Sequence, residues 1–210
     1  MGYGIAPNLI IKEIRRIGRA VHHSEKEYFK WRGKKSLSTS AAIETAAPNK
    51  GYYQRTNLFL FNLFLFSIDL PLHKRFVDLG HGFGGHCFIA KNYFKNVTGI
   101  EGDEKIFELS KESRSNLGSR YKSVDLKFGN FLEEDLSPFD VIYFARPFLE
   151  NFEKLMGDKL LEAKPGTTVI SYIYGDHKYG DLFPSQGFRK MIWDPSSVFL
   201  LYERIEDEPD

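Results

Sequence analysis

Four glycines in one short segment are the first residues in this sequence whose type and spacing suggest chemistry. The segment FVDLGHGFGGHCFIAK, residues 76–91, has the pattern of a buried strand, a turn and the start of a helix. Its glycines are Gly80, Gly82, Gly84 and Gly85. Such a loop lets a ligand approach the backbone closely and directs free N–H groups and the positive end of the helix at it. The spacing fits both GxGxG and the dinucleotide pattern GxGxxG, so it predicts a nucleotide-type site without identifying the ligand.

An acidic residue in the strand separates the candidate ligands. Asp78 lies two residues before the first glycine of the loop. Next to a pyrophosphate its charge would raise the cost of binding, whereas a cationic amino group would be favoured there. S-adenosylmethionine carries an ammonium and a sulfonium, a small carboxylate and an adenosine, and no phosphate. The sequence therefore predicts S-adenosylmethionine as the cofactor.

Candidate adenosine contacts follow the next two strands. Glu101 and Gly102 come about 20 residues after the loop, where a carboxylate can accept hydrogen bonds from both ribose hydroxyls, in NAD and in S-adenosylmethionine alike. After the third strand, the amide of Asn130 could bond to the adenine edge, and the ring of Phe131 could stack on its face. We expect these four residues to bind the nucleoside.

Short β-rich runs alternate with helical runs around these motifs, which is typical of a parallel sheet with helices on both faces. We expect strands at residues 75–79, 96–101, 124–128, 140–144, 167–172, 188–193 and 198–204. Helices should begin at the glycine loop, at Glu104 and at about Leu149, and one could also begin at Glu133. The turn at residues 194–197 is too short for a parallel crossover, so the last two strands should form an antiparallel hairpin.

Two helices are expected before this sheet, one amphipathic and one apolar. From Pro7 to Trp31, apolar residues recur at helical spacing, which predicts an amphipathic helix docked on another element. The segment Gln54–Ile68 is so apolar that we expect both of its faces to be covered. We therefore divide the chain into a helical extension or cap (1–70), a cofactor-binding domain (71–205) and a disordered acidic tail (206–210).

The charge of the chain is divided unevenly. Residues 1–70 hold 11 of the 29 Lys and Arg and only five of the 28 Asp and Glu, which leaves 18 basic and 23 acidic residues in 71–210. The basic first helix could steer RNA, a nucleotide or an acidic protein, or it could be a solvated surface. The sequence does not favour nucleic acid as the partner.

Composition also predicts what the chain lacks. The single cysteine, Cys87, allows no intramolecular disulfide, and no signal peptide is apparent, so we expect a cytoplasmic protein that is a monomer or homodimer. The apolar segment Leu58–Ile68 is shorter than the roughly 20 residues needed to span a bilayer, so no membrane association is expected. His81 and His86 lack a second Cys or His at ligand spacing, so no metal site is predicted.

The motifs together resemble the class I S-adenosylmethionine-dependent methyltransferases over about residues 76–204. VDLGHGFGG is similar to the first motif of that family, Glu101 to its acidic ribose clamp, and Gly129-Asn130 to its adenine-contacting position. In the family that last position is often Asp, so Asn130 departs from the pattern. The resemblance implies a Rossmann-like α/β fold, with a seven-stranded sheet that ends in an antiparallel hairpin.

The resemblance also suggests where the methyl acceptor would lie. The fourth strand runs into Arg146 and Phe148, where the family places residues that face the methyl group, and we take both as catalytic candidates. His177 is a candidate general base, because its ordinary pKa is close to neutral. Tyr53 and Thr56 precede the first strand of the sheet, where many relatives close a lid over the methionine end of the cofactor, and we take both as candidate cofactor contacts in such a lid. The Asn/Asp-Pro-Pro-Tyr signature of many base-methylating enzymes is absent, so a small molecule or a protein side chain is favoured as acceptor.

The predicted activity is direct in-line transfer of a methyl group to an unidentified acceptor. Two alternatives remain open from the sequence. The first is a module that binds S-adenosylmethionine without using it. The second is a nicotinamide-dependent oxidoreductase, against which Asp78 and the final hairpin both argue.

Overall fold

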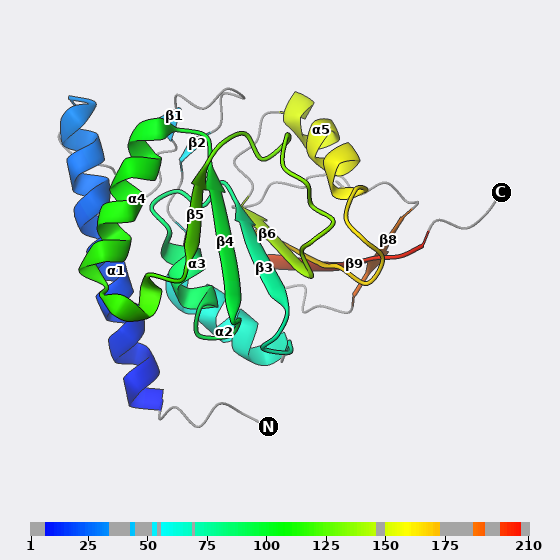
Figure 1. Ribbon diagram of the computed structural model, residues 1–210, viewed down its shortest axis with the longest axis horizontal. Coiled ribbons are helices and arrows are strands. Elements are labelled where there is room, and N and C mark those ends of the chain that lie inside the picture. The colour runs from blue at the N-terminus through cyan, green and yellow to red at the C-terminus, as the bar shows by residue number, and fades with distance from the viewer. Residues whose placement is uncertain are drawn as a thin grey trace.

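The structure, a computed structural model, describes residues 7–33, 43–44, 52–53, 56–68, 70–145, 150–172, 187–191 and 198–206. For residues 7–8, 43–44, 52–53 and 150–154 it describes the backbone alone. Within these ranges seven strands form one sheet, and helices pack around it (Figure 1). No helix of the described ranges has the length and hydropathy required to cross a membrane.

The order of strands in the sheet is β5-β4-β3-β6-β7-β9-β8. The strands are β3 (Arg75–Leu79), β4 (Asn96–Glu101), β5 (Asp125–Phe128), β6 (Val141–Ala145), β7 (Thr168–Tyr172), β8 (Phe188–Lys190) and β9 (Phe199–Arg204). Neighbours from β5 to β7 are parallel, whereas β9 is antiparallel to both β7 and β8. The predicted fold class is confirmed: a mostly parallel seven-stranded sheet with an antiparallel hairpin.

The helices are α1 (Pro7–Trp31), α2 (Leu58–Ile68), α3 (Gly85–Ala90), α4 (Glu104–Asn116) and α5 (Glu150–Leu160), with a short 3₁₀ helix, η1 (Ser119–Tyr121). A small antiparallel ribbon of β1 (Ile43–Glu44) and β2 (Tyr52–Tyr53) was not expected from the sequence. Helix α2 begins four residues later than predicted, because the side chain of Asn57 caps it. Its Oδ1 accepts from the backbone N–H groups of Phe59 and Leu60, at 3.0 and 3.2 Å.

The helix that could have begun at Glu133 does not form, so that prediction is wrong. After β5 the chain makes turns instead. Oδ1 of Asn130 accepts from the N–H of Leu132 at 3.2 Å, and Oδ1 of Asp135 accepts from the N–H of Ser137 at 2.9 Å. Such local bonds between side chain and backbone compete with the helical pattern, which explains why turns replace the helix.

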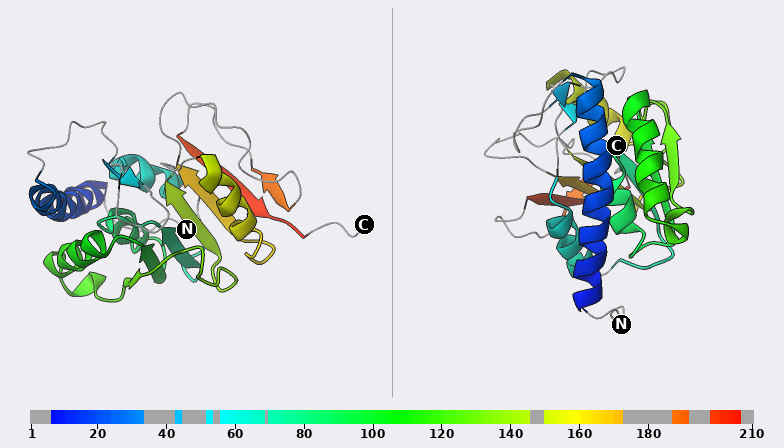
Figure 2. Two further views of the ribbon diagram at one scale, coloured as in Figure 1. Left: turned by 90° about the horizontal axis from the view of Figure 1, so that it is seen from above. Right: turned by 90° about the vertical axis from the view of Figure 1, so that its left-hand side faces the viewer.

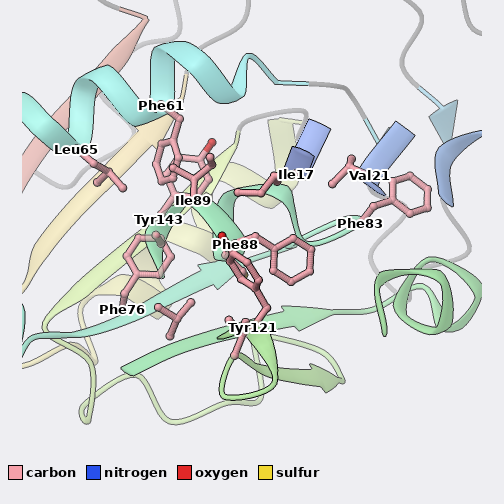
Figure 3. Packing of buried hydrophobic residues seen from close by; sticks show 14 of the residues in the cluster. Ile17, Val21, Phe61, Leu65, Phe76, Phe83, Phe88, Ile89, Tyr121 and Tyr143 are labelled. Carbon is pink, nitrogen blue, oxygen red and sulfur yellow. The ribbon is translucent and has the colours of Figure 1, made fainter. Parts of the chain in front are cut away.

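The sheet separates two hydrophobic clusters. One contains α1 to α4 with Phe76 of β3, and the other contains α5 with Val77 of β3. Helices α1 and α4 lie side by side at one end of the sheet (Figures 1 and 2). In the first cluster Ile17 of α1 and Phe61 of α2 join Phe76 (Figure 3), so α1 docks as an amphipathic helix should. The division of the chain at residue 70 remains a prediction.

Helix α2 leaves one of its faces open to solvent. Phe61 and Leu65 are buried against the sheet and α3. The exposed side chains, at 39–59%, are Phe59, Leu60, Leu63 and Phe66. The expectation that both faces are covered is therefore wrong. The helix packs through one stripe only, although its composition is apolar all round.

Candidate functional site

The glycine loop joins β3 to α3 at the carboxyl edge of the sheet. Gly80, Gly82 and Gly84 have φ values of 81°, 57° and 85°, the left-handed region that favours glycine. The backbone N–H groups of Gly80 and His81 donate to the carbonyl oxygen of Ile100, at 2.8 and 3.1 Å. These bonds fold the loop over the end of β4, so the predicted glycines lie next to the predicted acid of that strand.

Glu101 is held between two backbone donors. Its Oε2 accepts from the N–H of Gly82 and its Oε1 from the N–H of Asp103, both at 2.9 Å. The side chain is 6% exposed, and burial raises its pKa to about 7 against the lowering effect of the N–H donors. The backbone of Gly102 also acts as a donor to this group. A carboxylate has about four acceptor positions, so Glu101 retains acceptor capacity for a ligand hydroxyl.

Asp78 lies below the loop and is 1% exposed. The thiol of Cys87, in the first turn of α3, donates to its Oδ2 at 3.6 Å. Burial, with the nearby Glu101, raises the pKa of Asp78 to about 8. A cation brought close to this group would favour its ionised form. Two acidic side chains thus lie on neighbouring strands beside the same loop.

Tyr28 and Asp103 belong to this region and were missed by the sequence analysis. The side chain of Asp103 caps α4, because its Oδ1 accepts from the N–H of Ile106 at 2.9 Å. The hydroxyl of Tyr28, from α1, donates to Asp103 Oδ2 at 3.2 Å, and its ring lies edge-on to Phe83 of the loop at 5.8 Å. The sequence shows an acid before a predicted helix, which is typical of such a cap. It gives no sign that Tyr28 is the partner of Asp103, because 75 residues separate the two.

Two buried histidines flank the glycines as neutral groups. His81 Nδ1 donates to the carbonyl oxygen of Gly82 at 2.7 Å, and burial lowers the pKa of His81 to about 4. Burial lowers the pKa of His86 to about 3, and its Nε2 lies 2.6 Å from Oγ1 of Thr56. Among the described residues, no group of three His, Cys, Asp or Glu side chains could hold a metal ion.

The predicted adenine contacts lie where β5 ends. The N–H of Gly129 donates to the backbone oxygen of Glu101 at 3.0 Å, so this turn adjoins the acid. The amide of Asn130 bonds within its own turn, with Nδ2 donating to Glu133 Oε1 at 2.9 Å, while Phe131 packs against the second hydrophobic cluster. Their contacts with adenine remain predictions.

The structure describes some of the other predicted site residues only in part. Gly102 follows Glu101 at the same edge, and Thr56 contacts α3 through His86. Tyr53 is described by its backbone in β2 alone. The catalytic candidates Arg146, Phe148 and His177 lie outside the described residues, so their roles remain predictions.

The two acids predict how stability depends on pH. The pKa values of Glu101 and Asp78 are raised to about 7 and 8, so deprotonation of either group favours the unfolded chain. The lowered pKa values of His81 and His86 have the opposite effect, which fades above about pH 6.5 as histidines in the unfolded chain lose their protons. Between about pH 6.5 and 8 the effect of the carboxyl groups is the larger one, and the free energy of unfolding should fall by on the order of 2 kcal/mol.

Urea unfolding at half-unit steps from pH 6.5 to 8.5 measures this fall. The variant Asp78→Asn removes the group with the higher pKa, so its free energy of unfolding should change less over the same range. A wild-type free energy of unfolding that stayed constant or rose between pH 6.5 and 8 would contradict the prediction.

Comparison with known proteins gives no match to a family model or to a curated protein sequence, but it gives many to solved structures. The putative methyltransferase yhhF from Escherichia coli is similar with a TM-score of 0.59 and 13% identity, over 80% of this chain and 100% of that chain. An RNA methyltransferase from Salinibacter ruber, in complex with S-adenosyl-L-homocysteine, has a TM-score of 0.55 and 20% identity, over 74% and 97%. A mutant of MtNAS in complex with S-adenosylmethionine has a TM-score of 0.58 and 14% identity, over 95% and 76%.

At sequence identities of 13–20%, the structural similarity to these proteins establishes the fold of the chain. The strand order, the antiparallel β9 and the glycine loop after β3 agree with the same conclusion. The chain has the Rossmann-like fold of the class I S-adenosylmethionine-dependent methyltransferases.

Proposed function

We propose that this chain is an S-adenosylmethionine-dependent methyltransferase. The observation that carries the proposal is the Glu101 carboxylate, bonded to the N–H of Gly82 at 2.9 Å with acceptor capacity to spare. It places an acid that can bind a ribose diol beside a loop whose backbone a ligand can approach closely. Solved proteins of the same fold are described with S-adenosylmethionine or S-adenosyl-L-homocysteine bound, which supports this ligand.

The residues present fit a positively charged nucleoside better than a dinucleotide. Asp78 and Glu101 are both acidic and buried beside the loop, and a pyrophosphate next to them would disfavour the ionised form of each carboxyl group. A cationic ligand would instead stabilise their ionised forms. The nicotinamide-dependent alternative is therefore disfavoured by the chemistry of the site.

In the proposed mechanism the protein positions groups and excludes water. When bound, S-adenosylmethionine would supply a sulfonium methyl group: an acceptor lone pair would attack its carbon in line while the carbon–sulfur bond breaks and S-adenosylhomocysteine leaves. Glu101 would hold the ribose, and the positive-φ glycines would let the rest of the ligand lie on the backbone. His81 and His86 are buried and neutral, so they add no cation to repel the sulfonium. The roles of Arg146, Phe148 and His177 near the acceptor are part of the proposal.

Isothermal titration calorimetry with S-adenosylmethionine, S-adenosylhomocysteine and NAD tests the proposal. We expect both sulfur nucleosides to bind in the micromolar range or tighter, and NAD to give no heat. Release of S-adenosylhomocysteine in the presence of small-molecule, peptide and nucleic-acid acceptors separates an enzyme from a non-catalytic binding module. Binding of NAD alone would overturn the assignment.

A further inference from the structure

The outer face of α1 carries a stripe of cations that the proposed methyl-transfer site does not use. Its members, called here the α1 stripe, are Lys12, Arg15, Arg19, Lys26 and Lys30. All five are exposed, and none forms an ion pair among the described residues. At 3.6 residues per turn they fall within a sector of roughly 60°, and they extend over about 27 Å of helix.

The acids nearby do not neutralise this stripe. Within α1, Glu13 pairs with Arg16 at 2.6 Å, Glu25 is 1% exposed, and Glu27 is half-buried beside the stripe. The exposed residues of α1 therefore include Lys, Arg and His but no Asp or Glu. A long cationic surface without anions is suited to a polyanion.

Helix α4 lies beside α1 and turns its acids away. The hydroxyl of Ser113 on α4 bonds with the hydroxyl of Ser24 on α1 at 2.8 Å, which fixes the side of α4 that meets α1. At helical spacing, the exposed acids Glu104 and Glu108 lie about 180° and 140° from Ser113, and the third, Glu112, lies about 100° from it. Seen from the end of the sheet, α1 is the outermost element (Figure 2, right), and the five side chains of its stripe are exposed.

One end of the α1 stripe reaches the candidate site. Tyr28, one turn before the end of α1, donates to Asp103 beside Glu101. The ring of Trp31 lies 5.6 Å from the ring of Tyr28, yet Trp31 is 57% exposed. Trp31 directly follows Lys30, the last cation of the stripe, and lies about 100° from it round the helix. An exposed indole at that end can stack on an unpaired base, which a duplex does not offer.

We propose that the α1 stripe binds the phosphate backbone of single-stranded nucleic acid, with Trp31 stacking on a base, and that it delivers the strand to the proposed methyl-transfer site. The delivery rests on the proposed function, whereas the binding does not. The sequence left RNA as a less favoured partner. The excess of exposed cations over acids on α1 and the position of Trp31 beside Tyr28 favour a single strand.

Fluorescence anisotropy with a fluorescein-labelled 16-nucleotide RNA of mixed sequence tests the binding. Between 25 and 200 mM NaCl, five phosphate contacts should give a slope of log affinity against log salt of about −3.5. The variant Arg19→Glu/Lys26→Glu should bind more than tenfold more weakly, and Trp31→Ala about tenfold more weakly. The matched control Lys95→Glu/Lys190→Glu, with the same change of charge on other exposed lysines, should bind within twofold of wild type.

Several outcomes overturn the proposal. These are no binding of the RNA at 25 mM NaCl, equal losses in the two charge-reversed variants, or tighter binding of the same sequence as a duplex. Binding to vesicles with 30% phosphatidylserine but not to RNA would assign the stripe to a membrane instead. A DNA strand of the same sequence shows which sugar is preferred, and either result keeps a nucleic acid as the partner.

Calorimetry with S-adenosylhomocysteine on the same variants separates this proposal from the proposed function. Arg19→Glu/Lys26→Glu should bind the nucleoside as wild type does, because neither residue contacts the glycine loop. If no variant binds the nucleoside but the RNA results hold, the methyltransferase proposal fails and the strand-binding surface remains.

Discussion

Replacing Gly82 with valine will abolish measurable binding of S-adenosylmethionine, a loss of more than 100-fold. Gly82 has a φ of 57°, and its N–H donates to the carboxylate of Glu101 at 2.9 Å. A β-branched residue is a steric outlier at such a φ, so valine should distort the loop and displace the N–H that bonds to Glu101. Calorimetry with S-adenosylmethionine and S-adenosylhomocysteine measures the loss.

The matched control is Gly118→Val. Gly118 has a φ of 82°, and no atom lies within 4 Å of a Cβ built there, so valine brings backbone strain without a new contact. It precedes η1, away from the glycine loop. Both variants should lose stability to urea, but only Gly82→Val should lose the cofactor. Equal affinity in Gly82→Val and wild type would show that the ligand does not use this loop.

Truncating Phe61 to alanine should destabilise the chain by about 3–5 kcal/mol. The side chain is fully buried among the residues of the first hydrophobic cluster (Figure 3). Its ring centroid lies 4.7 Å from those of both His86 on α3 and Tyr143 on β6. It also meets Phe76 and Phe199 at 6.4 and 6.0 Å. One side chain thus connects α2 with α3 and three strands, and its removal leaves a large cavity.

Phe66→Ala provides the comparison for that measurement, because Phe66 lies on the same helix and is 59% exposed. Its truncation should change the free energy of unfolding by about 0.5 kcal/mol or less. Equilibrium urea unfolding at pH 6.5 measures both variants. Similar losses in the two would mean that α2 does not pack through the Phe61 face.

Local patterns predicted the elements that carry the glycine loop. The bounds of β3 and β4 agree with the prediction. In each case a β-rich run stops at a glycine, Gly80 after β3 and Gly102 after β4. The hydrogen bond from the N–H of Gly82 to Glu101 agrees with the topology, since parallel neighbours bring their carboxyl ends to one edge of the sheet. These features depend on residues close in sequence or on a rule of topology.

Features that depend on distant partners were not predicted. The hydrogen bond from Tyr28 to Asp103 and the exposure of one face of α2 both depend on how helices meet in space. Periodicity shows that a face is apolar, but not which element covers it or whether any does. The helix expected at Glu133 failed for a local reason, the turns capped by Asn130 and Asp135.

The position of β9 between β7 and β8 constrains how the molecule assembles during synthesis. Within the sheet, β8 pairs with β9 alone, and β9 joins β7 through bonds such as that from the N–H of Arg204 to the carbonyl of Thr167, at 2.9 Å. Strands β3 to β7 can pair as soon as they leave the ribosome, but β8 has no place to dock until residue 204 has emerged. A nascent chain arrested before that point would present the edge of β7 unpaired, which exposes it to association with other chains.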